Sequence, residues 1–282
     1  MRLITWNVQW CRGVDGQVSP QRIVEAAQSL GPFDVLCLQE VASGFPALPG
    51  SAGEDQFRML AELLPDFTAI DGPAVDLPAP QGRARFGNMI LSRYPVLGVL
   101  RHQLPWPADP DNKGMARALI EATLLAPSGP LRVMTTHLEY YSPVQRLAQA
   151  GAIKALHAQA CARAAAPGVQ DVSGRPLQSV PQTCSAVLTG DLNFRRGEPE
   201  YELLCAPTPA GTPRLVDAWA HWAPGRPQPH THALYDKGGK PESYACDFIF
   251  VSEDLQARIR EVHVDQDLQA SDHQPMVLEL AA

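Results

Sequence analysis

The hydrophobic positions of the chain form two patterns, short apolar runs of strand length and longer runs with helical spacing. The short runs are rich in β-branched and aromatic residues, which favours strands, at residues 2–8, 34–40, 87–100, 116–125, 131–139, 184–193, 244–252, 257–264 and 274–280. Helical spacing and helix-start residues predict helices at residues 19–32, 55–64, 142–166, 198–205 and 216–222. Proline, glycine and polar residues predict loops at residues 71–85, 169–181 and 224–244. Strands and helices are mixed without a repeat or a clear boundary, which favours one layered α/β domain over residues 1–282.

The net charge and the hydrophobic runs argue against two kinds of binding partner, duplex DNA and membranes. The net charge of −7 is not that of a protein that binds duplex DNA tightly and without sequence preference. It does not exclude a locally basic cleft, and a bound cation would change the local sign. We expect no stable membrane association, because no apolar run is long enough to span a bilayer.

The six cysteines and the first residues bear on the compartment. The cysteines form no Cys-x-x-Cys pair and several lie in apolar runs, which favours buried free thiols in a reducing compartment. The chain starts directly with a strand-like segment and shows no signal-peptide pattern. We therefore expect a cytoplasmic protein.

Polar side chains interrupt or end the apolar runs at eight positions: Asn7, Glu40, His137, Asp191, Asn193, Asp247, Asp272 and His273. Taken singly, most are typical of a turn, a cap or a solvated strand end. Asp247 is harder to explain in this way, because it lies between Cys246 and Phe248 and a buried charge needs a partner. Repeated carboxylate, amide and imidazole groups at strand ends favour one shared site.

The residue types in this set favour phosphate chemistry assisted by a hard cation. Glu40, Asn7 and Asp272 offer oxygen ligands and no thiolate, which suits Mg²⁺ or Mn²⁺ better than Zn²⁺. Asp191 and Asn193 are two residues apart, so on an extended chain they point to the same side. One can orient a water while the other binds a phosphoryl oxygen. Together with the histidines, which bind phosphate or move protons near neutrality, the set predicts metal-assisted hydrolysis of a phosphoester.

Seven short motifs occur in a fixed order: TWNVQ, DVLCLQE, GNMILSRYP, TTHLE, GDLNF, CDFIFVS and SDHQP. This ordered set resembles the endonuclease/exonuclease/phosphatase superfamily, whose fold is shared by DNase I and neutral sphingomyelinases. The motifs run from Thr5 to Pro275 and so cover nearly the whole chain. The resemblance implies a four-layered α/β sandwich, with two mixed β-sheets packed face to face and helices outside.

The resemblance also implies three metal-site residues. Glu40 is similar to the main metal-binding carboxylate of the superfamily. Asn7 matches the asparagine that lies beside the metal and helps to hold the metal or its waters. Asp272 matches a neighbouring acid that is credited with a second or alternative metal contact. The implied cofactor is Mg²⁺, with Mn²⁺ as an alternative.

Five further residues resemble the catalytic set. Asp191 matches the acid that positions or activates the attacking water, and Asn193 matches the amide that binds the scissile phosphate. His273 resembles the general base or phosphate stabiliser, and Asp247 the acid that orients it. His137 matches a phosphate-contacting histidine, and its THLE context differs from the tyrosine-containing motif of the exonuclease III branch.

Four residues have two interpretations each. Arg195 and Arg196 would either contact substrate or lie on a solvated loop. Arg146 would either contact substrate or be a helix-surface charge. Asn88 fits the motif pattern, and we expect a turn or hydrogen-bonding role for it.

Specificity is expected in loops, because the shared residues contact only the phosphate. The candidates are residues 42–54, 71–85 and 224–244, and the last of these contains His230, His232, Lys237 and Lys240. This last loop could reach the leaving group, or it could be a solvent loop. No third ligand is evident near His230 and His232, so we do not expect a metal site there.

The expected function is Mg²⁺-dependent hydrolysis of a phosphodiester by in-line attack of water. The substrate would be a nucleic acid, single-stranded or end-bearing, or a small phosphodiester. The alternatives are a phosphomonoesterase, a lipid phosphodiesterase of the same superfamily, and a binding module that has lost catalysis.

Overall fold

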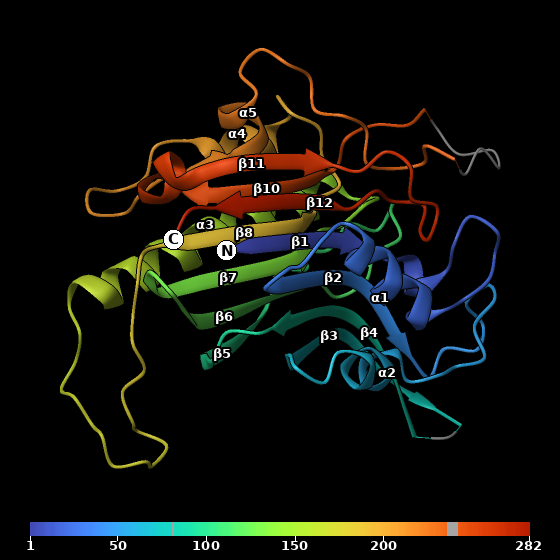
Figure 1. Ribbon diagram of the computed structural model, residues 1–282, viewed down its shortest axis with the longest axis horizontal. Coiled ribbons are helices and arrows are strands. Elements are labelled where there is room, and N and C mark those ends of the chain that lie inside the picture. The colour runs from blue at the N-terminus through green and yellow to red at the C-terminus, as the bar shows by residue number, and fades with distance from the viewer. Residues whose placement is uncertain (81, 236–241) are drawn as a thin grey trace.

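The computed structural model describes residues 1–80, 82–235 and 242–282, and within these ranges two six-stranded sheets dominate (Figure 1). The strands of the first sheet, in spatial order, are β11 (Ile259–Val264), β12 (Met276–Leu280), β1 (Arg2–Asn7), β2 (Val35–Ser43), β4 (Gly82–Ser92) and β3 (Thr68–Ala79). Those of the second are β5 (Val96–Gln103), β6 (Ala118–Ala126), β7 (Gly129–His137), β8 (Ala186–Asp191), β10 (Asp247–Ser252) and β9 (Leu215–Asp217). Each sheet is mixed, because β1–β2 and β7–β8 are parallel and the other pairs are antiparallel.

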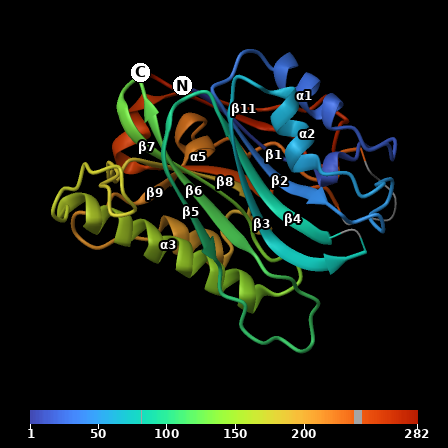
Figure 2. The same cartoon turned by 90° about the horizontal axis from the view of Figure 1, so that it is seen from below.

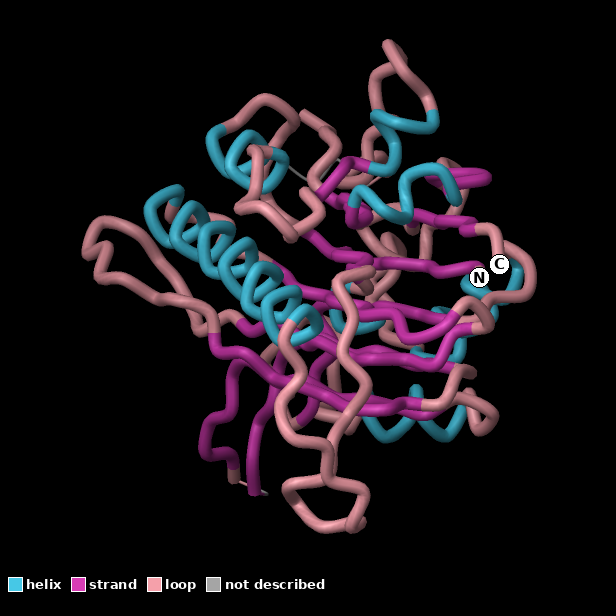
Figure 3. The backbone as a smooth tube through the Cα atoms, turned by 90° about the vertical axis from the view of Figure 1, so that its left-hand side faces the viewer, coloured by secondary structure: helices cyan, strands magenta, loops and turns pink. Residues whose placement is uncertain are grey.

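Helices cover the outer faces of both sheets, namely α1 (Pro20–Ser29), α2 (Gln56–Leu63), α3 (Pro143–Ala165) and α4 (Pro199–Cys205). The short helix α5 (Ala218–Trp222) packs instead into the central cluster between the sheets, against β10 and β11. The 3₁₀ turns are η1 (Gln9–Cys11) and η2 (Glu253–Arg258). Figure 2 shows α1 and α2 on one side of the strands and α3 on the other. Figure 3 shows α3 running across the face of its sheet. The expected α/β sandwich of two face-to-face mixed sheets is confirmed.

Three apolar clusters hold these layers together. The central cluster joins the facing sides of the two sheets, with Ile90 and Ile120 among its fully buried members. A second cluster packs α1 and α2 on the first sheet, and a third packs α3 and α4 on the second. Ser19 and Ser142 begin α1 and α3 by accepting a hydrogen bond from a backbone N–H three residues on, as the sequence predicts.

The loop expected at residues 71–85 is wrong, because residues 71–79 and 82–85 belong to the paired antiparallel strands β3 and β4. The prolines of β3 are tolerated because β3 is an edge strand, where a missing N–H donor on the solvent side removes no hydrogen bond to a neighbouring strand. The register to β4 also shifts between Pro73 and Val75, and such a bulge accommodates proline. The apolar run 87–100 is two strands in different sheets, β4 and β5, rather than one. The short strand β9 was not expected, since three residues carry too little pattern.

Candidate active site

Three site residues lie side by side at the ends of neighbouring strands of the second sheet. His137 ends β7 and pairs in parallel register with Asp191, which ends β8. Asp191 in turn lies opposite Asp247, the first residue of β10. Residues that are directly opposite in a sheet share a face, so this register alone gathers an imidazole and two carboxylates.

The first sheet supplies the opposite wall from β1, β2 and the segment before β12. Asn7 ends β1, and Glu40 lies in β2 where the register to β4 shifts between Leu38 and Val41. Such a bulge turns a side chain out of the regular alternation. His273 is fixed by Trp6, whose Nε1–H donates to the His273 carbonyl at 2.9 Å.

Glu40 and Asn193 both have left-handed backbone conformations, with φ of 59° and 53°. This backbone conformation is unfavourable for a residue with a side chain. Backbone strain of this kind is found mainly at functional sites. The Asn193 turn is closed by its own N–H, which donates to Asp191 Oδ1 at 3.1 Å. The short spacing of Asp191 and Asn193 therefore forms a tight turn, in which the backbone N–H of Asn193 bonds to the Asp191 carboxylate.

Asn7 joins the two walls. Its Nδ2 donates to Asp191 Oδ2 at 2.9 Å and to Glu40 Oε1 at 3.2 Å. Its Oδ1 accepts from the backbone N–H of Gln9 at 3.1 Å. The amide thus presents hydrogens, not its oxygen, to the two acids, and it holds them in place.

His273 is held between two carboxylates. Its Nδ1 lies 2.8 Å from Asp247 Oδ2, and its Nε2 lies 3.6 Å from Asp191 Oδ2. Burial lowers the pKa of His273, but the charges of Asp247 and Asp191 outweigh it and raise the pKa to about 10. At neutral pH and without a cation nearby, this ring is an imidazolium with Nε2–H facing the pocket.

His137 has the opposite electrostatic character. Burial, followed by the positive charges of Arg117 and His273, lowers its pKa well below the ordinary value, so the ring is neutral. Its Nε2 accepts from Asn193 Nδ2 at 2.9 Å, which places the proton on Nδ1. Within the described residues Nδ1 has no hydrogen-bond partner, and it lies 3.7 Å from Glu40 Oε1. A donor of this kind suits a substrate oxygen or a water.

The acids of the site suit a divalent cation. Burial and the nearby Asp272 raise the pKa of Glu40 to about 7, and burial together with Asp247 also raises the pKa of Asp191. The raised pKa values show that too little positive charge surrounds these carboxylates. A hard cation bound to the carboxylate oxygens would supply that charge.

Two groups of ligating side chains fall within 4.8 Å in the part of the chain that is described. One contains Asp191, Cys246, Asp247 and His273, and the other contains His232, Asp272 and His273. Glu40 is in neither group, so the carboxylates expected to share a metal, Glu40 and Asp272, are not clustered as closely as these.

The expectation that His232 has no third ligand nearby is wrong. His232 Nε2 lies 3.9 Å from Asp272 Oδ2, and the His232 and His273 rings are 4.7 Å apart. The loop 224–244 therefore contributes to the site, whereas His230 is exposed and contacts Ser243. Lys237 and Lys240 lie outside the described residues. The sequence could not predict this contact, because His232 lies far along the chain from Asp272 and His273.

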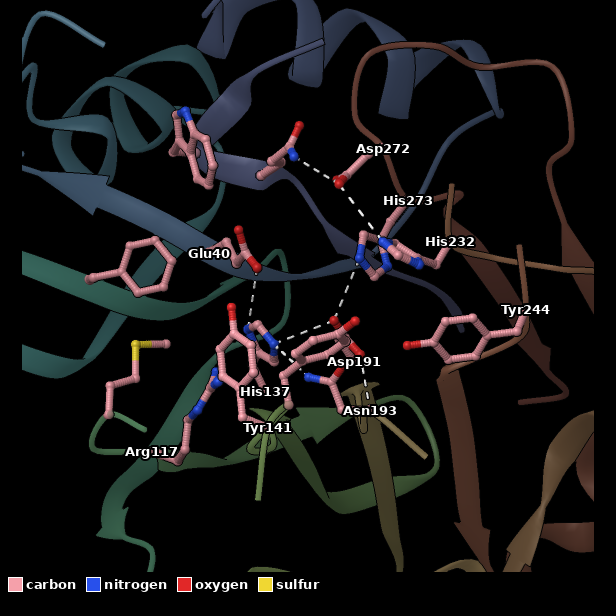
Figure 4. A pocket seen from close by; sticks show the side chains of 15 residues that line it. Glu40, Arg117, His137, Tyr141, Asp191, Asn193, His232, Tyr244, Asp272 and His273 are labelled. Carbon is pink, nitrogen blue, oxygen red and sulfur yellow. Dashed lines mark hydrogen bonds and ion pairs between the residues drawn. The ribbon is translucent and has the colours of Figure 1, made fainter. Parts of the chain in front are cut away.

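These residues surround one cavity of about 410 Å³ (Figure 4). Asn7 and Asp247 lie behind its surface, and the other six predicted residues line it. Sequence reasoning missed several lining residues, namely Gln9, Trp10, Phe86, Met115, Arg117, Tyr140, Tyr141 and Tyr244. Only the tyrosine pair directly after THLE carried a usable signal, since two adjacent aromatic residues there do not continue the strand alternation.

Each of the four residues with two interpretations has a structural partner. Arg146 is buried, with Nε 2.9 Å from Glu200 Oε1, and Arg196 pairs with buried Asp217. Asn88 donates to the Ala118 carbonyl at 2.9 Å, which is the hydrogen-bonding role expected. The guanidinium of Arg195 lies 4.6 Å from the centre of the Tyr244 ring.

Comparison with known proteins agrees with this geometry. Residues 4–273 match the endonuclease/exonuclease/phosphatase family, and the chain belongs to this family of metal-dependent phosphoric ester hydrolases. No curated protein matches the chain. In the described residues, no helix has the length and apolar character needed to cross a membrane.

Solved structures share the fold over the whole chain. An endonuclease/exonuclease/phosphatase from Beutenbergia cavernae is 25% identical with a TM-score of 0.64, covering 100% of this chain and 72% of its own. A mannosyl-6-phosphatase from Bacteroides thetaiotaomicron is 16% identical with a TM-score of 0.64, covering 100% of both chains. TDP2 of D. rerio, complexed with a single-strand DNA product, is 17% identical with a TM-score of 0.63, covering 100% of this chain and 99% of its own.

Proposed function

We propose that the protein is a divalent-cation-dependent phosphodiesterase that hydrolyses its substrate by in-line attack of water. The observation that carries the proposal is the convergence of Asp191, Asn193, His137 and His273 on one cavity that Glu40 also lines. In-line hydrolysis needs a group that orients the water and donors for the phosphoryl oxygens, and this set contains both.

The residues divide these tasks by their charge. The Asp191 carboxylate, fixed by Asn7 and by the Asn193 N–H, orients the water and accepts its proton. A protonated His273 would donate from Nε2 to a phosphoryl oxygen, while Asp247 fixes the ring through Nδ1. Neutral His137 donates from Nδ1, its unpartnered atom within the described residues. This division favours Asp191 over His273 as the base.

Glu40 and Asp272 would hold the cation, with Asn7 orienting Glu40. Mg²⁺ fits the oxygen donors, and Mn²⁺ is the alternative. When bound, the cation would neutralise charge that develops on the phosphate and the leaving oxygen. The neighbouring folds include both a phosphatase and a DNA-product complex. They leave the choice between monoester and diester to experiment.

A hydrolysis screen tests the proposal. The protein is assayed with Mg²⁺, Mn²⁺ or EDTA on bis-p-nitrophenyl phosphate, p-nitrophenyl phosphate, single- and double-stranded DNA, RNA and sphingomyelin. We expect metal-dependent turnover of diesters that is lost in Glu40→Ala and His273→Ala while the fold survives. Unchanged turnover in either variant would refute the site assignment, and a preference for p-nitrophenyl phosphate would indicate the monoesterase.

A further inference from the structure

One edge of the cavity carries two tyrosines that are unusually exposed for their position. Tyr140 and Tyr141 line the cavity, yet they are 41% and 53% exposed. Their rings form a T-shaped pair with centroids 4.9 Å apart. Single exposed aromatic residues need no explanation, but an exposed pair at the mouth of a site marks a surface for a ligand.

The backbone beneath these rings is rigidly held. Buried Glu139 accepts hydrogen bonds from the N–H groups of both Tyr140 and Tyr141 at 3.0 Å. Arg146 donates from Nη1 to the carbonyls of Glu139 and Tyr140 at 3.1 Å. Buried charged groups thus fix a segment whose rings stay in water. Such preorganisation lowers the entropy cost of binding a ligand to those rings.

Arg117 adds a polar anchor beside the rings. Its Nε lies 3.2 Å from Glu139 Oε2, while its Nη1 is buried without a hydrogen-bond partner in the described residues. Arg117 is 5% exposed and lines the same cavity. Nη1 itself is enclosed, so what Arg117 offers a ligand in the cavity is its positive charge beside the rings.

The lining of the cavity is aromatic rather than basic. Five of its described lining residues are aromatic: Trp10, Phe86, Tyr140, Tyr141 and Tyr244. Arg117 is the one Lys or Arg among them, and it is already paired. Figure 4 shows Tyr141 and Tyr244 on opposite sides of Asp191 and Asn193. Recognition at this edge would therefore depend on stacking more than on phosphate charge, as for unpaired bases.

We propose that Tyr140 and Tyr141 form a stacking subsite for a nucleobase attached to the scissile phosphodiester. Arg117, which lines the same cavity, would place its positive charge beside this nucleotide. The substrate would then present an unpaired nucleotide, because a base within a duplex has no free face to offer. This inference rests on the phosphodiesterase function proposed above and names its substrate class.

Two esters with one leaving group test the subsite kinetically: thymidine 5′-(p-nitrophenyl phosphate) and ethyl p-nitrophenyl phosphate. We expect kcat/KM to favour the thymidine ester. Tyr140→Ala and Tyr141→Ala should each lower the ratio of the two kcat/KM values by about five- to 150-fold, the range for one stacked base. Tyr140→Phe and Tyr141→Phe keep the ring and should retain most of the preference.

Tyr235→Ala is the matched control, because Tyr235 is 40% exposed and does not line the cavity. It should leave the ratio unchanged. If the wild-type protein shows no preference, or if the alanine variants slow both esters equally, the subsite is refuted and the phosphodiesterase function stands.

A binding measurement separates the two proposals. Calorimetry in Mn²⁺ compares AMP with ribose 5-phosphate, which differ by the base. Tighter binding of AMP that is lost in the alanine variants supports the subsite even if neither ester is hydrolysed, in which case the proposed function fails alone. Equal binding of the two probes, or binding of neither, refutes the subsite.

Discussion

The floor of the cavity and its tyrosine edge are built in different ways. The floor is the set of eight polar residues predicted from the sequence: Asn7, Glu40, His137, Asp191, Asn193, Asp247, Asp272 and His273. They come from segments distant in sequence, and nearly all are buried, as in the case of Asp191 at 2% exposure and Asp247 at 1%. The edge consists of two residues adjacent in sequence, exposed and held from below. The floor therefore depends on the packing of both sheets, whereas the edge depends on one short segment between β7 and α3.

This difference has a functional consequence. Floor residues contact one another, so a change in one alters the pKa and position of the others. Edge residues have exposed rings, so the chain tolerates changes to them. We infer that the floor determines the chemistry and the edge determines which phosphoester is accepted, in line with the general separation of scaffold and specificity.

The largest effect is expected from a floor carboxylate. Asp191→Asn should lower kcat by about 10²- to 10⁴-fold, because the amide cannot accept the proton of the water. Steady-state kinetics on a diester would measure it. The control is Asp217→Asn, since Asp217 is equally buried on the same sheet and pairs with Arg196 outside the cavity. A comparable loss of kcat in the control would attribute the effect to folding.

The backbone beneath the floor is expected to be nearly as sensitive. Gly190 has φ of 142°, and a Cβ there would lie 1.8 Å from the Thr136 carbonyl oxygen of β7. Gly190→Ala should lower the free energy of unfolding by about 3 kcal/mol, because the β7–β8 ladder must separate. Urea unfolding would measure it.

Gly129→Ala is the control for this effect. Gly129 also has a positive φ, 109°, but a Cβ there meets nothing within 4 Å. Only the backbone strain of about 1 kcal/mol is expected. Equal losses in the two variants would show that contact with β7 does not limit residue 190.

The floor could be predicted from sequence for a physical reason. A carboxylate or imidazole in an apolar run is costly unless a partner exists, so Asp247 and Asp191 indicated a shared site before any contact was known. Strand-end positions also share an edge of the sheet, and the register of β7, β8 and β10 brings those residues together.

Other features could not be predicted, because they depend on contacts between distant segments. His232 belongs to the site only because residues 231–233 bond to the segment just before β12, with the Gln274 N–H donating to the Thr231 carbonyl. Arg117 precedes an apolar strand and resembles a surface charge, yet Glu139 buries it. The β3 strand was hidden by its prolines, which only its place at the sheet edge permits.

A smaller effect should reveal the electrostatic cost of the floor. Since the pKa of Glu40 is about 7 in the folded protein and 4.5 ordinarily, the folded state keeps a proton that the unfolded state releases between these values. In EDTA, stability should therefore fall as pH rises from about 4.5 to 7, by about 2.5 kcal/mol from this group. Glu40→Gln should remove that part of the slope.

Cation binding should offset the same cost. Saturating Mg²⁺ should raise the unfolding temperature more at pH 8, where Glu40 is ionised, than at pH 5. Glu40→Gln should reduce this difference, and Glu54→Gln, a nearby acid outside the cavity lining, is the control. Equal stabilisation at the two pH values would show that Glu40 does not hold the cation.

The smallest effect is expected on the far side of the cavity, and it tests how far the edge extends. Arg195 is exposed and lies over the Tyr244 ring, an interaction of about 0.5–1 kcal/mol. Arg195→Gln should change KM by about fivefold at most, because Tyr244 loses this one interaction but stays in position. Arg196→Gln is the matched control, since its guanidinium pairs with Asp217 and should affect stability without changing KM. If KM changes only in Arg195→Gln, Tyr244 belongs to the substrate-selecting edge. If KM changes in neither variant, substrate selection is confined to the side of Tyr140 and Tyr141. The Tyr244 side would then have no part in selecting the substrate.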